Sequence, residues 1–212
     1  EELENGPANL EIAVFGKTVQ ISAAFVISNP RIISISPSMV TYGDIVTITG
    51  EGFNPDDLNV SIKGWQAQII EASETMIRVV VPDYLSFESP DIMVYTSDRY
   101  LYSYNSLQLF PSTILSISPL TAKEGETVTI NGNYFNPIRQ YNIVYLKSNS
   151  TGRTYFANTI SGNRNMIEFV VPSLTRDYYS IIVDIQGWTC SSVDVFTCHS
   201  PWALIDNMSI GQ

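Results

Sequence analysis

The chain has 212 residues, of which 44% are hydrophobic and 15% are charged, and its formal net charge is −10. No apolar run approaches the ~18 residues that a membrane-spanning helix needs. The acidic balance lacks the basic footprint of a nucleic-acid-binding protein, so we expect no nucleic-acid partner.

Residues 1–30 contain two β-rich runs, at residues 9–15 and 19–27. We interpret them as strands left from a preceding β module, with added strands on the following module as the alternative. The chain begins at Glu1 rather than at Met. We therefore expect it to be a processed or excised part of something longer.

One 23-residue stretch occurs twice, 82 positions apart and without a gap. Residues 33–55 read ISISPSMVTYGDIVTITGEGFNP, residues 115–137 read LSISPLTAKEGETVTINGNYFNP, and 12 of the 23 positions are identical. A repeat of this length indicates tandem copies of one module. We place the first domain at residues 31–112, the second at residues 113–199, and a tail at residues 200–212.

The apolar residues of both copies follow the period of two that is typical of strands, as in Val46 and Ile48 beside Thr47 and Thr49. Seven short strands in each module predict an all-β protein made of two tandem immunoglobulin-like sandwiches. In the first module we expect strands at residues 32–36, 45–49, 59–62, 66–70, 76–81, 91–96 and 107–110. In the second we expect them at residues 114–118, 127–131, 142–147, 154–160, 166–171, 180–185 and 193–197.

The repeated residues have folding roles. The prolines end the first strand because they cannot donate to a ladder, and one glycine of each copy suits a turn with positive φ. The second glycine closes the next strand, and the phenylalanine three positions later plugs one end of the sandwich. These structural positions are Pro37, Gly43, Gly50 and Phe53, with Pro119, Gly125, Gly132 and Phe135 as their counterparts.

A later match, MIRVVVP at residues 76–82 and MIEFVVP at residues 166–172, has an offset of 90 instead of 82. Eight residues have therefore been inserted into the second module. We place the insertions at the hairpin tips of residues 148–153 and 161–165, where loops absorb extra length at small cost.

The pattern I-x-x-I-x-P, a glycine, then V-T-I-x-G-x-x-F resembles the IPT/TIG module, an immunoglobulin-like domain of the E-set type. The resemblance implies a structural motif without catalytic residues. It implies settings in cell-surface receptors, bacterial surface proteins and adhesins, proteins that act on starch, and Rel-like DNA-binding factors, the last disfavoured by the charge. The tail, with Trp202, Leu204 and Met208, is similar to the opening of a kelch-type propeller blade.

Catalytic and metal-binding sets are sparse. The single histidine, His199, would have to carry any Ser-His-Asp site alone, and with Cys190 and Cys198 it falls short of the four ligands usual for structural zinc. We expect no cofactor and no metal. Asp56 and Asp57 with Glu51 could hold calcium, but solvated loop charge is the simpler interpretation.

The two cysteines leave two alternatives open. A disulfide between Cys190 and Cys198 requires Cα atoms within ~7 Å, whereas eight extended steps span ~26 Å. The bond would therefore require the chain between them to loop back and would spoil the last strand. Two free, half-buried thiols are the other alternative.

Four tyrosines, Tyr95, Tyr100, Tyr102 and Tyr104, crowd the segment YTSDRYLYSYNS. The last three share a face if the segment is extended. Exposed tyrosines can stack on sugar rings or anchor a protein partner, whereas cross-strand packing or a contact between modules would need no ligand.

These observations predict a non-enzymatic, extracellular or cell-surface spacer and interaction scaffold, with a protein or a glycan as its partner. Anchoring, for example by a lipid on a bacterial outer surface, would need a segment outside this chain. The alternative is an accessory carbohydrate-binding module of a larger carbohydrate-active or glycan-uptake protein.

Overall fold

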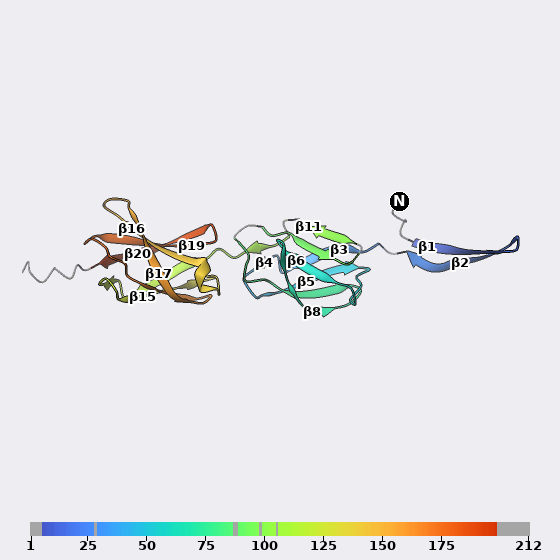
Figure 1. The fold of residues 1–212 in the computed structure, drawn as a ribbon, viewed down its shortest axis with the longest axis horizontal. Helices are drawn as coiled ribbons and strands as arrows, with labels where there is room; N and C mark the ends of the chain where they lie inside the picture. Colours follow the sequence, from blue (N-terminus) through green and yellow to red (C-terminus); the bar gives the residue numbers. More distant parts are fainter. Residues whose placement is uncertain (1–5, 28, 87–88, 98, 105, 199–212) are drawn as a thin grey trace, which may run out of the picture. The chain divides into compact units, whose positions relative to one another are not determined.

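The structure is a computed structural model, and it describes residues 6–198 except residues 28, 87–88, 98 and 105. Its elements are strands, together with one 3₁₀ turn at Arg139–Tyr141 (Figure 1). The chain divides into two compact units, one comprising residues 1–82 and 89–108 and the other residues 83–88 and 109–212. Within the described residues, no helix is both long and apolar enough to cross a membrane.

The first module consists of two four-stranded sheets and a small third one. One sheet has the order β3-β5-β9-β8, the second has the order β11-β10-β6-β7, and β12 pairs with β4. The strands are β3 (Arg31–Ser36), β4 (Met39–Val40), β5 (Ile45–Glu51), β6 (Asn59–Ile62), β7 (Trp65–Gln66), β8 (Gln68–Ala72), β9 (Met76–Val80), β10 (Ile92–Tyr95), β11 (Tyr100–Ser103) and β12 (Gln108–Leu109).

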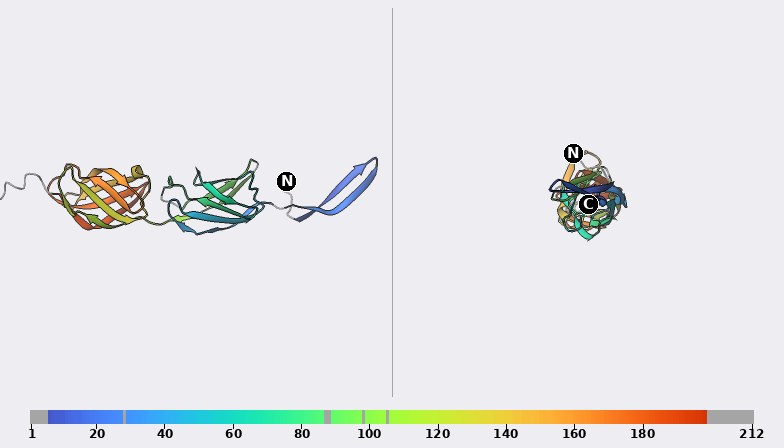
Figure 2. Two further views of the ribbon diagram at one scale, coloured as in Figure 1. Left: turned by 90° about the horizontal axis from the view of Figure 1, so that it is seen from below. Right: turned by 90° about the vertical axis from the view of Figure 1, so that its right-hand side faces the viewer.

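The second module has one continuous ladder in the order β13-β15-β18-β17-β16-β19-β20-β14. Its strands are β13 (Thr113–Ser118), β14 (Thr121–Ala122), β15 (Thr127–Asn133), β16 (Asn142–Ser148), β17 (Thr154–Gly162), β18 (Met166–Val170), β19 (Tyr178–Ile185) and β20 (Trp188–Cys198). Before these modules lies a two-stranded ribbon of β1 (Gly6–Val14) and β2 (Lys17–Ile27) (Figure 2).

Each module has its own apolar core, built from the inward positions of alternating strands. In the first module, Val46, Ile48, Ile77 and Val79 are fully buried on β5 and β9. A second set of fully buried residues occupies the same places in the second module: Val128, Ile130, Ile167 and Phe169. The predicted all-β fold with two tandem immunoglobulin-like domains is thus confirmed.

Several strand boundaries differ from those expected from the sequence. Residues 66–70 form two strands, β7 and β8, because the chain changes sheets at Ala67, whose amide bonds to Val60 O at 2.8 Å. In the second module the corresponding β17 stays continuous, pairing first with β16 and then with β18. The short strands β4, β11 and β14 were not expected, and β20 is longer than the predicted residues 193–197.

The repeated glycine and phenylalanine form the same contact in both modules. A methyl group added at Gly50 would collide with the Phe53 ring and with the carbonyl oxygen of Arg31. At Gly132 it would collide in the same way with the Phe135 ring and the carbonyl oxygen of Thr113. Each phenylalanine is buried and lies directly on the glycine backbone, so only hydrogen fits there.

The backbone bonds around this contact are also repeated. Phe53 N bonds to Glu74 O and Phe135 N bonds to Arg164 O, both at 3.0 Å. The turn glycines Gly43 and Gly125 have φ of 71° and 84°, as expected for residues in the left-handed region. The peptide bonds that precede Pro37 and Pro119 are both cis.

Most of the length added to the second module lies in the β16–β17 hairpin, and none lies between β17 and β18. The loop between β8 and β9 has the same length and the same hydrogen bonds as the loop between β17 and β18. Ser73 Oγ in the first loop and Asn163 Oδ1 in the second each accept from the backbone amides two and three residues later. The prediction of an insertion at residues 161–165 is therefore wrong. The extra residues lengthen the β16–β17 hairpin, where loop 149–153 replaces the two-residue turn of Lys63 and Gly64.

Asp177 organises this longer hairpin tip. Its carboxylate accepts hydrogen bonds from the hydroxyls of Ser148 and Ser150 and, at 2.7 Å, from the amide of Tyr178. These donors stabilise the charged form and lower the pKa of Asp177 to about 2.

The Gly–Phe contact predicts a large effect of one methyl group. Gly132→Ala should destabilise the second module by about 1–3 kcal/mol, because the Phe135 ring and the Thr113 carbonyl cannot both give way. Gly162→Ala is the matched control, because its added methyl would meet its nearest neighbour, Asn142 Nδ2, at 3.5 Å. Denaturant unfolding, with hydrogen exchange as its probe, measures the stability of the second module in both variants. Equal stability of the two variants would contradict the assigned contact.

The Asp177 cap predicts a titration at unusually low pH. Because the folded-state pKa is depressed, the cap favours the folded hairpin above the unfolded-state value of ~3.9 and is lost as pH falls through about 2. Carboxyl NMR should give a midpoint for Asp177 near 2. Amide shifts of Ser150 and Tyr178 should follow it, and Asp177→Asn should abolish that response. A midpoint near 4 would show that the serine hydroxyls do not hold the carboxylate.

Candidate functional site

The β10–β11 hairpin brings the four tyrosines of the sequence motif to one side of its sheet. Tyr95 pairs directly with Tyr100, and Met93 pairs with Tyr102. The intervening positions Ile92 and Val94 are buried, so the tyrosines lie on the opposite, outward face. We call Tyr95, Tyr100, Tyr102 and Tyr104 the tyrosine face.

The rings of the tyrosine face stack in two pairs. Tyr95 and Tyr100 have ring centroids 6.0 Å apart with planes inclined by 20°, and Tyr102 and Tyr104 are 5.8 Å apart and inclined by 7°. Stacking does not bury them, since Tyr100, Tyr102 and Tyr104 remain 63%, 53% and 69% exposed. The cross-strand packing anticipated from the sequence occurs, yet it leaves large ring surfaces open to solvent.

Amide side chains continue this face across the sheet. Tyr95 OH donates to Gln66 Oε1 at 3.4 Å, and Gln66 Nε2 donates to Asn59 Oδ1 at 3.1 Å. Asn59 lies on β6 beside Tyr95, and Gln66 lies on the neighbouring β7. The motif did not include these two residues, although Asn59 and Gln66 each directly precede a buried residue, Val60 or Ala67, so the period of two would have placed both outward.

The chemistry of this surface is that of a binding platform. Aromatic faces offer apolar contact at low conformational cost, and hydroxyls and amides offer hydrogen bonds at the edge. No described side chain of this set is a nucleophile activated by a neighbouring base. The arrangement can therefore hold a flat, hydroxyl-bearing or aromatic ligand, and it has no group placed to transform one.

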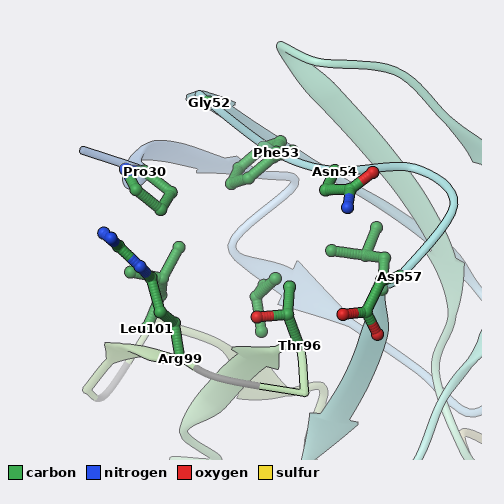
Figure 3. Close-up of a pocket in the computed structure, with 10 residues that line it drawn as sticks. Pro30, Gly52, Phe53, Asn54, Asp57, Thr96, Arg99 and Leu101 are labelled. Atoms are coloured by element: carbon green, nitrogen blue, oxygen red, sulfur yellow. The ribbon is translucent and has the colours of Figure 1, made fainter. Parts of the chain in front are cut away.

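A pocket of about 230 Å³ opens at one end of the same module (Figure 3). Its walls come from loop 52–58 and from the segment around the β10–β11 turn, with Phe53 and Leu101 as apolar walls. Asn54, Asp57 and Arg99 add polar groups. Arg99 Nη1 donates to Asn29 Oδ1 at 3.3 Å.

Two of the three acids that could hold calcium, Asp57 and Glu51, have separate partners. Asp57 accepts from the amide and hydroxyl of Ser97 at 3.1 and 2.6 Å, which holds its pKa below the usual range. Glu51 instead pairs with Arg31 at 3.0 Å. Over the described ranges, no group of three or more potential ligands lies together.

The two cysteines lie on β20 and both are free thiols. The strand is continuous from Trp188 to Cys198, so the chain does not loop back to bring them together. The disulfide alternative is therefore wrong, and the free-thiol alternative agrees with the structure. Burial raises the pKa of the Cys190 thiol to about 11 and also raises that of Cys198. His199 and the kelch-like tail at residues 200–212 lie outside the described residues.

The raised pKa of Cys190 predicts a thiol that reacts slowly with alkylating agents. At pH 8, a pKa of about 11 leaves ~100-fold less thiolate than the ordinary cysteine value of 9.0. Alkylation of Cys190 in the folded protein should be slower by about that factor than in denaturant, as measured by mass spectrometry of the peptide. Rapid labelling of native protein, or a 2 Da gain in mass on reduction, would contradict the buried free thiol.

Taken together, the ladders and the separate cores define a protein of two tandem immunoglobulin-like β-sandwiches. The IPT/TIG domain model matches residues 30–109 and again residues 112–198. The chain therefore belongs to the IPT/TIG family. No curated protein matches it.

Solved structures with a similar chain path include proteins of two kinds. The surface glycan-binding protein PbSGBP-B from Prevotella bryantii has 16% identity over 78% of this chain and 42% of its own, with a TM-score of 0.45. A Bacteroides ovatus SGBP-B, crystallised with a mixed-linkage heptasaccharide, has 15% identity over 92% of this chain and 55% of its own, with a TM-score of 0.31. The plexin A4 extracellular region has 18% identity over 81% of this chain and 18% of its own, with a TM-score of 0.40. This chain thus spans about two fifths of the Prevotella protein and under a fifth of plexin A4.

Proposed function

We propose that this chain is a non-enzymatic segment of a cell-surface protein, in which the tyrosine face of the first module binds a glycan. The exposed rings of Tyr100, Tyr102 and Tyr104 are the single observation that carries the proposal. Large aromatic surface left in water costs free energy unless a ligand covers it, and exposed apolar patches often mark interaction sites.

The neighbouring groups favour a neutral sugar over a charged ligand. The tyrosine hydroxyls, Gln66 and Asn59 can exchange hydrogen bonds with sugar hydroxyls while the rings stack on the apolar faces of the sugar. The net charge of −10 works against polyanions such as nucleic acid. It leaves binding to an uncharged polysaccharide unaffected.

The scaffold role follows from the way the core is divided. Each module buries its own apolar residues and repeats the same Gly–Phe contact, so each can hold its shape by itself. Modules of this kind separate and present whatever domains flank them. Under this proposal the protein is exported and displayed at a cell surface.

The second candidate is a protein partner on the same tyrosine face. Tyrosine is enriched among the residues that dominate binding energy at protein interfaces, and paired rings on a rigid hairpin are well preorganised. A related possibility, an accessory carbohydrate-binding role beside a catalytic domain of a larger protein, uses the same site and differs only in what flanks the chain.

The proposal predicts that stacking residues control affinity. On a panel of soluble neutral polysaccharides that includes xyloglucan and mixed-linkage glucan, Tyr100→Ala should weaken binding by ~10-fold or more, the equivalent of ~1.4 kcal/mol. Tyr100→Phe should keep most of the affinity, because it retains the ring. Affinity electrophoresis and calorimetry measure both.

The matched control for this experiment is Tyr178→Ala. Tyr178 lies on β19 of the second module and is 62% exposed, nearly the same as Tyr100. It should have no effect on glycan affinity. Equal losses for the two variants would argue against the tyrosine face, and binding of a protein partner that is lost only with Tyr100→Ala would favour the second candidate.

A further inference from the structure

The N-terminal hairpin of β1 and β2 has one apolar face and one polar face. Ile12 pairs with Val19 and Leu10 with Ile21 on the apolar face, whereas Glu11 pairs with Gln20 on the other and accepts its amide at 2.9 Å. In the described chain these strands pair only with each other. The apolar side chains are accordingly about half exposed: Leu10, Ile12, Val14, Val19, Ile21 and Phe25. A hairpin alone is at best marginally stable in water.

The turn of this hairpin has two residues with positive φ, like the turn between β19 and β20, and the Lys63–Gly64 turn of the first module shares this form. Phe15 and Gly16 have φ of 49° and 77°, and Gln186 and Gly187, 171 positions later, have φ of 50° and 96°. The strand that follows each turn has 11 residues, β2 in one case and β20 in the other. The β10–β11 connection of the first module differs, since Thr96 N bonds to Arg99 O across a wider loop.

The residue pairing of the two hairpins agrees at an offset of 171, both near the turn and near the open end. Val14 pairs with Lys17 as Ile185 pairs with Trp188, and Ala8 pairs with Phe25 as Tyr179 pairs with Phe196. Both ladders shift register within one residue of the same point, between Ala8 and Leu10 and between Ser180 and Ile182. A side-chain oxygen bonds the backbone at each shift: Asn9 Oδ1 accepts from Ala23 N, and Ser192 Oγ accepts from Ile181 N.

The apolar face of the hairpin corresponds to the face that β19 buries. Tyr179, Ile181, Val183 and Ile185 are buried in the second core, and their counterparts at the same offset are Ala8, Leu10, Ile12 and Val14. Phe196 is buried too, and its counterpart is Phe25. On the outer face Asp184 corresponds to Ala13. Inward and outward positions therefore agree between the hairpins.

We infer that β1 and β2 are the last two strands of a third IPT/TIG module, whose remaining strands are the partner of the apolar face. In the second module β16 pairs antiparallel with β19 from Asn142–Ile185 to Ser148–Tyr179, so the equivalent strand of the third module pairs with β1 in that register. β14 pairs parallel with the end of β20, so its equivalent lies along the end of β2. The occupant is thus a β-sandwich fragment of the same family, with an apolar inner face.

The test exchanges the hairpins within the full chain. In the chimera, residues 8–27 replace residues 179–198, so that Asp177 and Tyr178 of the hairpin-tip cap are kept. Hydrogen–deuterium exchange then reports on β15 and β16 of the second module. If the hairpin is a genuine last strand pair, it completes the sandwich and both strands stay protected. A second chimera with Ala8→Tyr restores the ring that Tyr179 supplies to the core.

Two aspartates in the transplanted hairpin give the decisive comparison. Ile12→Asp places a charge where Val183 is buried and should lower protection of β16 by ~100-fold or more. Ala13→Asp, one residue further on, recreates Asp184 and should leave protection unchanged. In the original N-terminal hairpin the same two substitutions should change the protection of β1 and β2 by similar amounts, because both faces are exposed there.

Three results would overturn the inference. The first is loss of protection in both the plain chimera and the Ala8→Tyr chimera. The second is equal protection of β16 in the Ile12→Asp and Ala13→Asp chimeras. The third is a homodimer of the natural chain, seen by sedimentation, that protects β1 and β2, because the apolar face would then belong to a second copy.

Discussion

The contact between a phenylalanine ring and a glycine backbone is the constraint on which both sandwiches depend. Phe53 and Phe135 can be buried only because Gly50 and Gly132 have no side chain, and the close approach fixes the end of β5 and β15 against β3 and β13. The same phenylalanines bond through their amides to the turn that precedes β9 and β18. One ring therefore ties together three strands that are neighbours in the sheet, and it recurs in both modules at the same offset of 82 residues.

Much of the fold follows from local patterns in the sequence. Alternation in β5 and β15 places Val46, Ile48, Val128 and Ile130 inward, and the structure buries all four. The split of β7 from β8 could not be read from residues 66–70, because changing sheets at Ala67 depends on the opposite layer and not on the strand's own pattern. Of the two predicted insertion sites, residues 148–153 agree with the structure and residues 161–165 do not. The extra length is shared between a loop and its two strands, and a sequence offset does not separate these.

The candidate site was partly visible in the sequence. Period-two spacing correctly placed Tyr100 and Tyr102 on one face, since β11 is extended over these residues. The stacked pairing of Tyr95 with Tyr100 required the register of β10 against β11, and Gln66 and Asn59 came near only through two further strand pairings. Such a surface is assembled by the sheet, so its composition exceeds any contiguous motif.

The paired thiols of β20 have a consequence for where the second module can mature. Cys190 and Cys198 lie on one continuous strand without a bond between them, and burial raises the pKa of both thiols. Folding of this sandwich needs neither an oxidant nor a disulfide isomerase, because no disulfide forms. The fold of this sandwich therefore does not depend on forming a disulfide, and it does not require an oxidising compartment.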